Sequence, residues 1–135
     1  MSLGALSPQL MLNAYSKGIF PMAETAADPE LFWVDPKRRG ILPLDRFHIS
    51  RSMRQFLQCQ SITATLNKNF DVVLFQCANR DETWINSTLH RNYKELHALG
   101  RCHSLEVWQD GALLGGVLGI TIGGVFCGES MFSQG

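Results

Sequence analysis

Apolar and polar residues alternate with a period of two through the last third of the chain. Three such runs, HSLEVWQ (103–109), ALLGGVLGITI (112–122) and VFCGESMF (125–132), are each typical of a β-strand. Asp110-Gly111 and Gly123-Gly124 separate them, and both pairs are tight-turn residues. The pattern therefore predicts an antiparallel meander of three strands.

The segment before this meander has the three- to four-residue spacing of a helix. One face of the predicted helix is apolar and consists of Leu89, Tyr93, Leu96 and Leu99. Asn86 is a suitable N-cap, and Gly100 is suited to end the helix. The same kind of reasoning predicts helices that begin after Ser7, after Ser50 and at Asn67, and short strands at 31–34, 40–42 and 61–66. Residues 22–44 otherwise read as irregular, since three prolines interrupt them.

Helices followed by an antiparallel meander predict an α+β fold. The last strand is apolar and rich in glycine, and no element follows it in the sequence. Because an α+β domain normally covers both its sheet faces and its edges, we expect the chain to be one part of a larger fold that is truncated at its C-terminal side.

Composition is that of an ordinary globular protein, with 45% hydrophobic and 18% charged residues among 135. No apolar run approaches the ~20 residues that cross a bilayer, and the first residues lack the pattern of an export signal. We therefore expect a cytoplasmic protein without membrane contact. Cys59, Cys77, Cys102 and Cys127 show no metal-ligand spacing among themselves or with histidine, which predicts buried free thiols and no metal.

The formal net charge is zero, but the charges are unevenly placed. Residues 36–58 contain six basic residues and one acidic residue, and the remainder is acidic. Lys37, Arg38, Arg51 and Arg54 belong to this basic segment, which could face phosphates or could be a solvated surface.

Glu129 stands out because it lies within an otherwise apolar strand. A buried carboxylate destabilises the fold unless it is paired or hydrogen-bonded, and the neighbouring Gly128 is typical of a bulge or of a close approach by a ligand. One interpretation is an anion that awaits a cationic ligand group. The other is an outward-facing residue, with Phe126, Gly128 and Ser130 on the opposite face.

Two tryptophans, Trp33 and Trp84, lie in proline-rich or polar connections with few apolar neighbours. Aromatic side chains in loops can stack on nucleobases, or they can pack against the edge of the hydrophobic core. Trp108 alternates within a predicted strand and is interpreted as structural.

Several motifs resemble one family along nearly the whole chain. YSKGIFPM, LFWVDPKRRGILP, FHISRSMR, TWIN, HSLEVWQDGALLGGVLGI and VFCGESMFS are similar, in this order, to leucyl/phenylalanyl-tRNA–protein transferases. The resemblance implies a small N-terminal domain, here residues 1–60, followed at 61–135 by part of an N-acetyltransferase-like (GNAT) domain. It implies transfer of leucine or phenylalanine from aminoacyl-tRNA to the N-terminal Arg or Lys of a protein, which marks that protein for degradation, with no cofactor.

The resemblance also implies roles for individual residues. Glu129 would hold the α-amino group, Phe126 and Val117 would line the pocket for the amino-acid side chain, and Trp33 and Trp84 would contact the terminal adenosine. Val117 stands where the family often has methionine. The basic residues Lys37, Arg38, Arg51 and Arg54 become candidates for contact with the tRNA backbone.

The family carries an Asp-x-Gln element after this region that is implicated in peptidyl transfer, and this sequence lacks it. We therefore assign no catalytic residue within the 135 residues, and expect that they do not catalyse transfer on their own.

Two other functions fit parts of the same pattern. An acyl-CoA-dependent N-acyltransferase of the same fold would need a glycine-rich phosphate loop after the last strand. A non-enzymatic RNA-binding module would need only the tryptophans and the basic segment, and would not distinguish aminoacylated from bare tRNA.

Overall fold

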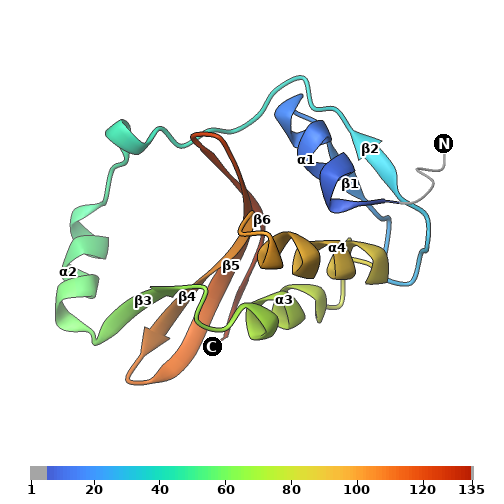
Figure 1. The fold of residues 1–135 in the computed structure, drawn as a ribbon. Coiled ribbons are helices and arrows are strands. Elements are labelled where there is room, and N and C mark those ends of the chain that lie inside the picture. Colours follow the sequence, from blue (N-terminus) through green and yellow to red (C-terminus); the bar gives the residue numbers. More distant parts are fainter. Residues whose placement is uncertain (1–5, 135) are drawn as a thin grey trace.

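The computed structural model describes residues 6–134, which form a mixed α/β fold with two antiparallel sheets (Figure 1). Strands β1 (Phe20–Met22) and β2 (Phe32–Val34) form the small sheet, and β3 (Ile62–Leu66), β4 (Cys102–Gln109), β5 (Ala112–Ile122) and β6 (Val125–Ser133) form the larger one. The helices are α1 (Pro8–Ser16), α2 (Arg51–Cys59), α3 (Phe70–Ala78) and α4 (Ser87–Ala98), with a short 3-10 turn, η1, at Leu44–Arg46.

The larger sheet has the order β3-β4-β5-β6, so the predicted meander is confirmed and β3 adds a fourth strand. Asp110 and Gly111 both have positive φ, 51° and 82°, as a two-residue hairpin turn of this twist requires. The register aligns Leu66, Leu105, Val117 and Met131 in one row across all four strands. We call this set the outer row.

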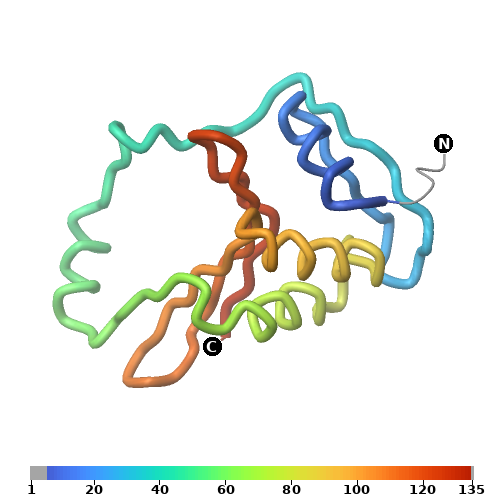
Figure 2. The backbone as a smooth tube through the Cα atoms, in the orientation of Figure 1, coloured from blue at the N-terminus to red at the C-terminus, as the bar shows by residue number. Residues whose placement is uncertain are grey.

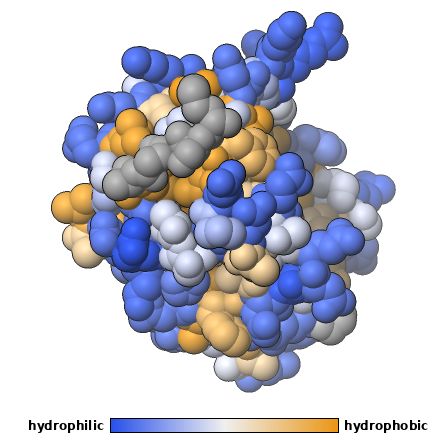
Figure 3. Space-filling model, turned by 90° about the vertical axis from the view of Figure 1, so that its right-hand side faces the viewer, coloured by the Kyte–Doolittle hydropathy of each residue, from blue (hydrophilic) through white to orange (hydrophobic). Residues whose placement is uncertain are grey.

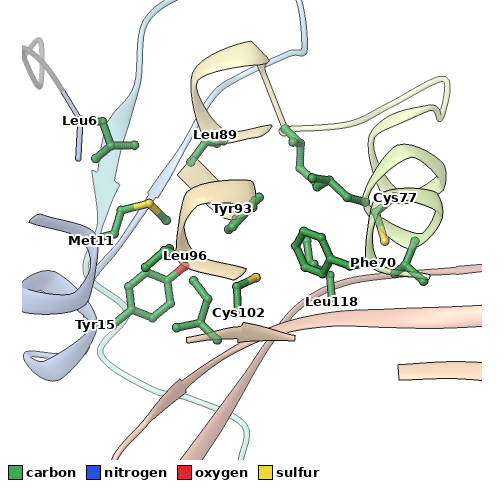
Figure 4. Close-up of a cluster of buried hydrophobic side chains, with 14 of the residues drawn as sticks. Leu6, Met11, Tyr15, Phe70, Cys77, Leu89, Tyr93, Leu96, Cys102 and Leu118 are labelled. Carbon is green, nitrogen blue, oxygen red and sulfur yellow. The ribbon is translucent and has the colours of Figure 1, made fainter. Parts of the chain in front are cut away.

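The two faces of the larger sheet differ in what covers them. Leu118 and Ile120 are fully buried on the face that packs against α3 and α4. Leu118, Tyr93 and Leu89 belong to the buried cluster drawn in Figure 4, and Leu74 is part of the same core. The outer row alternates to the opposite face, and its two ends are open to solvent, with Leu66 70% and Met131 63% exposed. The side of the molecule formed by α4 and the β1–β2 hairpin is mostly hydrophilic, with apolar residues visible between polar ones (Figure 3).

Helix α1 completes the core from the N-terminal side. Met11, Ala14 and Tyr15 are buried, and Tyr15 points from α1 toward α4 and the sheet (Figure 4). Residues on both sides of position 60 thus contribute to one hydrophobic cluster. The division into domains at 1–60 and 61–135 stays a prediction.

Three predicted helix caps are confirmed. The side chains of Ser7, Ser50 and Asn86 accept hydrogen bonds from backbone N–H groups of the first turn at 3.1, 3.1 and 2.9 Å. Gly100 adopts φ 75° after α4, where a residue with a side chain would be strained.

The predicted start of α3 at Asn67 is wrong, because the helix begins at Phe70. Asn67 has φ 57°, which is incompatible with a right-handed helix. Its side-chain Oδ1 instead accepts a hydrogen bond from the backbone N–H of Ser104 at 3.0 Å. Asn67 therefore ties the end of β3 to β4.

The predicted strand at 40–42 is also absent from the described residues, and a strand at Phe20–Met22 was not predicted. The strand was not predicted because Pro21 argues against a strand, although proline is tolerated in a short edge strand such as β1. Residues 37–59 form instead a long arm that leaves β2, passes through η1 and α2 and returns at β3 (Figure 2).

This arm packs little against the rest of the chain. Helix α2 has no buried residue, and Ile41 and Leu44 are 82% and 88% exposed. Cys59, at the end of α2, is therefore exposed, and its predicted burial is wrong. All four cysteines are free, as predicted, with Cys77 and Cys102 buried and Cys127 half-buried.

Candidate active site

Glu129 is the extra residue of a β-bulge. On β5 the neighbours Leu118 and Gly119 pair with Ser130 and Gly128 of β6, so that Glu129 has no partner across the ladder. The bulge reverses the alternation of β6, and Ser130 therefore lies opposite the buried Leu118. The interpretation that Phe126, Gly128 and Ser130 share one face is wrong for Ser130, because a period of two does not continue through a bulge.

Two tyrosines from different helices hold the Glu129 carboxylate. Tyr93 of α4 donates a hydrogen bond to Oε1 at 3.0 Å, and Tyr15 of α1 donates to the same oxygen. No hydrogen bond to Oε2 occurs within residues 6–134. One carboxylate oxygen is thus fixed by the fold, and the other remains available to a ligand.

The environment of this carboxylate changes its acidity. Burial raises the pKa of Glu129 to about 7, and the hydrogen bonds from Tyr15 and Tyr93 and the charge of Arg39 oppose that rise. Burial and the neighbouring Glu129 also raise the pKa of both tyrosines well above the usual value. The phenols therefore stay protonated as donors, while Glu129 titrates near neutral pH.

A cavity of about 150 Å³ opens beside Glu129. Its other walls are Phe20 and Met22 of β1, Arg39 of the arm, Trp84 and Gly128. Gly128 contributes no side chain, so the backbone of β6 is accessible there. The cavity combines one carboxylate, one guanidinium and aromatic walls, which suits a ligand with an ammonium group and a flat ring.

Trp84 is positioned by contacts on both sides. Its carbonyl accepts a hydrogen bond from the Ala23 N–H at 3.3 Å, and its ring meets Tyr93 edge-on with centroids 6.4 Å apart. Of the predicted site residues, Trp84 and Glu129 line the cavity beside Glu129 together.

The other predicted contacts lie elsewhere. Trp33 of β2 packs against the hydrophobic core. Val117 and Phe126 lie on the outer face of the sheet, and the Phe126 ring covers Gly119, which pairs with Gly128. They do not line the cavity beside Glu129, and their role as a side-chain pocket stays a prediction.

The predicted tRNA-contacting residues lie along the arm. Arg51 and Arg54 border an open hollow of about 420 Å³ on α2, together with Gln55 and Gln58. Lys37 and Arg38 are exposed in the connection after β2. The side chains of all four are thus accessible to a large polyanion.

Sequence reasoning missed Tyr15, Tyr93, Arg39, Phe20 and Met22 as site residues. A signal did exist for Tyr93, which falls at a core position of the α4 pattern. A buried tyrosine needs a partner for its hydroxyl group, and the apolar strands offer few candidates besides Glu129.

A second carboxylate, that of Glu106 on β4, is fully buried, and its contacts are those of a structural residue. It accepts hydrogen bonds from Ser104, from Thr65 at 2.6 Å and from the Lys68 N–H at 3.1 Å. Burial alone would raise its pKa, but the hydrogen bonds outweigh burial and lower it. These donors use both oxygens, so Glu106 offers nothing to a ligand.

Neither a metal centre nor a membrane span is found within the part of the chain that the structure describes. Residues 6–134 contain no group of three or more His, Cys, Asp or Glu side chains that could hold a metal ion. Among the same residues, no helix is both long and apolar enough to cross a bilayer.

Comparison with known sequences identifies the family. Residues 41–135 match the family described as leucyl/phenylalanyl-tRNA protein transferase, and residues 4–37 match the N-terminal domain of the same transferase.

Curated relatives agree with this match. Leucyl/phenylalanyl-tRNA–protein transferases from Ruegeria sp. and Cereibacter sphaeroides are 57% and 56% identical over 129 and 134 residues, which is 96% and 99% of this chain. The matched regions are 61% and 63% of those relatives, so the chain spans about three-fifths of their length. The chain belongs to the leucyl/phenylalanyl-tRNA protein transferase family.

Proposed function

We propose that the protein transfers leucine or phenylalanine from aminoacyl-tRNA to the N-terminal Arg or Lys of an acceptor protein, which marks that protein for degradation. The observation that carries the proposal is the Glu129 carboxylate, with one oxygen fixed by two phenols and the other open toward a cavity that Trp84 also lines. The names of the curated relatives support the same activity.

Glu129 is suited to hold the α-ammonium group of the aminoacyl moiety. A partly buried anion whose second oxygen lacks a donor gains a charge-assisted hydrogen bond when an ammonium binds. Above about pH 7 the Glu129 carboxylate is mostly ionised. Its negative charge favours the protonated form of an amine that binds beside it.

Trp84 provides an aromatic surface for the terminal adenine, and base stacking of this kind contributes about 1–3 kcal/mol. Trp33, from the neighbouring β2, remains our second candidate for this contact. Phe126 and Val117 remain the proposed lining for the leucine or phenylalanine side chain.

The reaction itself is an acyl transfer. The neutral N-terminal amine of the acceptor attacks the ester carbonyl carbon, a C–N bond forms, and the bond to the 3′ oxygen of the tRNA breaks. The amine loses a proton and the departing oxygen gains one. Glu129 takes no part in this proton transfer, because it is engaged by the α-ammonium group; its role is to orient the ester.

Three further points belong to the proposal. We propose that the larger sheet with α3 and α4 is part of a GNAT-like domain, that residues 1–60 form the smaller N-terminal domain, and that the protein is cytoplasmic. Lys37, Arg38, Arg51 and Arg54 would contact the tRNA backbone from the arm.

The test is a transfer assay with the full-length protein, tRNA charged with labelled leucine or phenylalanine, and a peptide with N-terminal Arg. Glu129→Gln keeps the shape but removes the anion, and a charge-assisted hydrogen bond contributes about 1.5–3 kcal/mol. We expect kcat/KM to fall roughly 10- to 150-fold. Glu95→Gln, on the exposed side of α4, is the matched control and should retain parental activity.

Binding measurements separate this function from its alternatives. The parent should bind aminoacylated tRNA more tightly than bare tRNA, and Glu129→Gln should reduce that preference. Equal activity of Glu129→Gln and parent, with unchanged thermal stability, would refute the role of Glu129. Equal affinity for charged and bare tRNA would favour an RNA-binding module.

A further inference from the structure

Arg39 is the one positively charged side chain on the wall of the Glu129 cavity. Its guanidinium carbon lies 5.1 Å from the centroid of the Phe20 ring, as in a cation–π contact. Within residues 6–134 its guanidinium makes no hydrogen bond, and the only ion pair there joins Lys94 to Asp71. The Arg39 guanidinium thus packs on the face of the Phe20 ring, and its N–H groups make no hydrogen bond within residues 6–134.

Glu129 and Arg39 give the cavity two opposite charges that do not neutralise each other by direct contact. Arg39 is close enough to lower the pKa of both Glu129 and Cys127, although burial raises each of them more. A ligand complementary to this cavity has a positively charged group that faces Glu129 on β6 and a negatively charged group that faces Arg39 on the arm. It also has a flat apolar part between Phe20, Met22 and Trp84.

The end of an aminoacyl-tRNA has this distribution of charge. The α-ammonium group lies on one side of the terminal ribose, and the phosphate attached to the 5′ oxygen of the same nucleotide lies on the other. A guanidinium binds phosphate oxygens through parallel N–H groups, which fixes orientation as well as affinity.

Building on the function proposed above, we propose that Arg39 binds the 5′ phosphate of the terminal nucleotide and so orients the aminoacyl ester in the cavity. Arg39 is a positioning residue in this scheme, because it contacts the substrate away from the reacting ester. It differs in this way from Arg51 and Arg54, which lie on α2 and would contact the tRNA backbone outside the cavity.

The alternative role for Arg39 on the same geometry is to act only on Glu129, by keeping the carboxylate ionised. The two roles predict different results for ligands with and without the phosphate, since an effect through Glu129 would weaken both ligands equally.

The test uses two probes and the full-length protein. The probes are 3′-phenylalanylamino-3′-deoxyadenosine, a stable amide analogue of the ester, with either a free 5′ hydroxyl or a 5′ phosphate. Isothermal titration calorimetry should show that the parent binds the phosphorylated probe about tenfold more tightly or better. Arg39→Ala should abolish that gain and leave the affinity for the unphosphorylated probe within about twofold.

Three variants serve as comparisons. Arg39→Lys should retain part of the gain, because it keeps the charge but loses the fork of N–H donors. Arg91→Ala removes an exposed arginine of α4 that lies outside the cavity and should retain all of it. Glu129→Gln should weaken both probes and leave the gain unchanged.

The outcomes distinguish the two proposals. If the parent binds both probes with equal affinity, or if Arg39→Ala weakens both equally, the role of Arg39 is refuted while the function stands. If the parent binds neither probe, the proposed function of this cavity fails together with the role of Arg39. Circular dichroism of Arg39→Ala, an exposed position, should match the parent.

Discussion

At the scale of single residues, the central feature is the Glu129 carboxylate, which two tyrosines bind by hydrogen bonds and which forms no ion pair within the described residues. Tyr15 and Tyr93 come from different helices and converge on one oxygen of Glu129. Hydrogen bonds from phenols stabilise the anion, yet burial has the larger effect, and the pKa rises from 4.5 to about 7. The folded protein therefore binds the Glu129 proton more tightly than the unfolded chain does.

This difference predicts how stability depends on pH. The favourable contribution of protonated Glu129 is fully present below pH 4.5 and is lost as pH rises to about 7. The free energy of unfolding of the parent, minus that of Glu129→Gln, should fall over this interval and then become constant. Urea denaturation of both proteins at several pH values measures it.

Glu95→Gln is the control for this series, since its exposed carboxyl should give no such trend. A difference between parent and Glu129→Gln that grows as pH rises would contradict the prediction. It would mean that the two phenols stabilise the anion more than burial disfavours it.

Single residues also show what the sequence could predict about the site. Glu129 was identifiable because a carboxylate in an apolar strand needs a partner. Its partners were not, because Tyr15 lies 114 residues away and only tertiary packing brings it there. Arg39 was one of six basic residues in its segment, and nothing in the sequence distinguishes the one that reaches the cavity.

At the scale of elements, local signals predicted most helices and strands. The caps of α1, α2 and α4 and the Asp110-Gly111 turn depend on neighbouring residues alone, and all were correct. The start of α3 was misplaced because Asn67 bonds to β4, a contact that is remote in sequence. The strand β1 was missed because its pairing with β2 overrides the presence of Pro21.

Helix α2 is the element that packs least against the rest of the described chain. It buries no residue of its own and presents Arg51 and Arg54 to solvent. Replacing either arginine by alanine should weaken tRNA binding and reduce the slope of log K against log salt by about 0.7–0.9, because each phosphate contact releases counterions. A salt titration of binding by the full-length protein measures this slope.

Trp84→Ala is the matched comparison. It should weaken binding without changing the slope, since stacking on a base releases no counterions. Its effect should disappear for tRNA that lacks the 3′ adenosine, whereas the arginine effect should persist. A parental slope for Arg51→Ala and Arg54→Ala would show that α2 is an ordinary solvated surface.

At the scale of the whole molecule, the two faces of the larger sheet are unequal. Helices α3 and α4 cover one face, and the outer row crosses the other. Exposed apolar rows of this kind bind hydrophobic dyes. The 135-residue chain should therefore enhance the fluorescence of anilinonaphthalene sulfonate, and the double variant Leu66→Lys, Met131→Lys should reduce that enhancement severalfold.

Leu99→Lys provides the control, because Leu99 is 64% exposed at the end of α4 and does not belong to the outer row. All variants should keep a free energy of unfolding within about 0.5 kcal/mol of the parent, as surface substitutions usually do. An equal loss of dye fluorescence in Leu99→Lys would show that the dye does not report on the outer row.

The bulge in β6 has a consequence for how such a site can change over evolutionary time. Glu129 is a surplus residue in the ladder, and the position opposite Leu118 is still filled by Ser130. The carboxylate therefore takes the place of no core side chain in the ladder, and the core residues that must match it are the two tyrosines that donate to it. Removing the residue altogether would restore regular alternation to β6 but leave the hydroxyl groups of Tyr15 and Tyr93 without their acceptor, so loss of the site by deletion would favour matching changes at the two tyrosines.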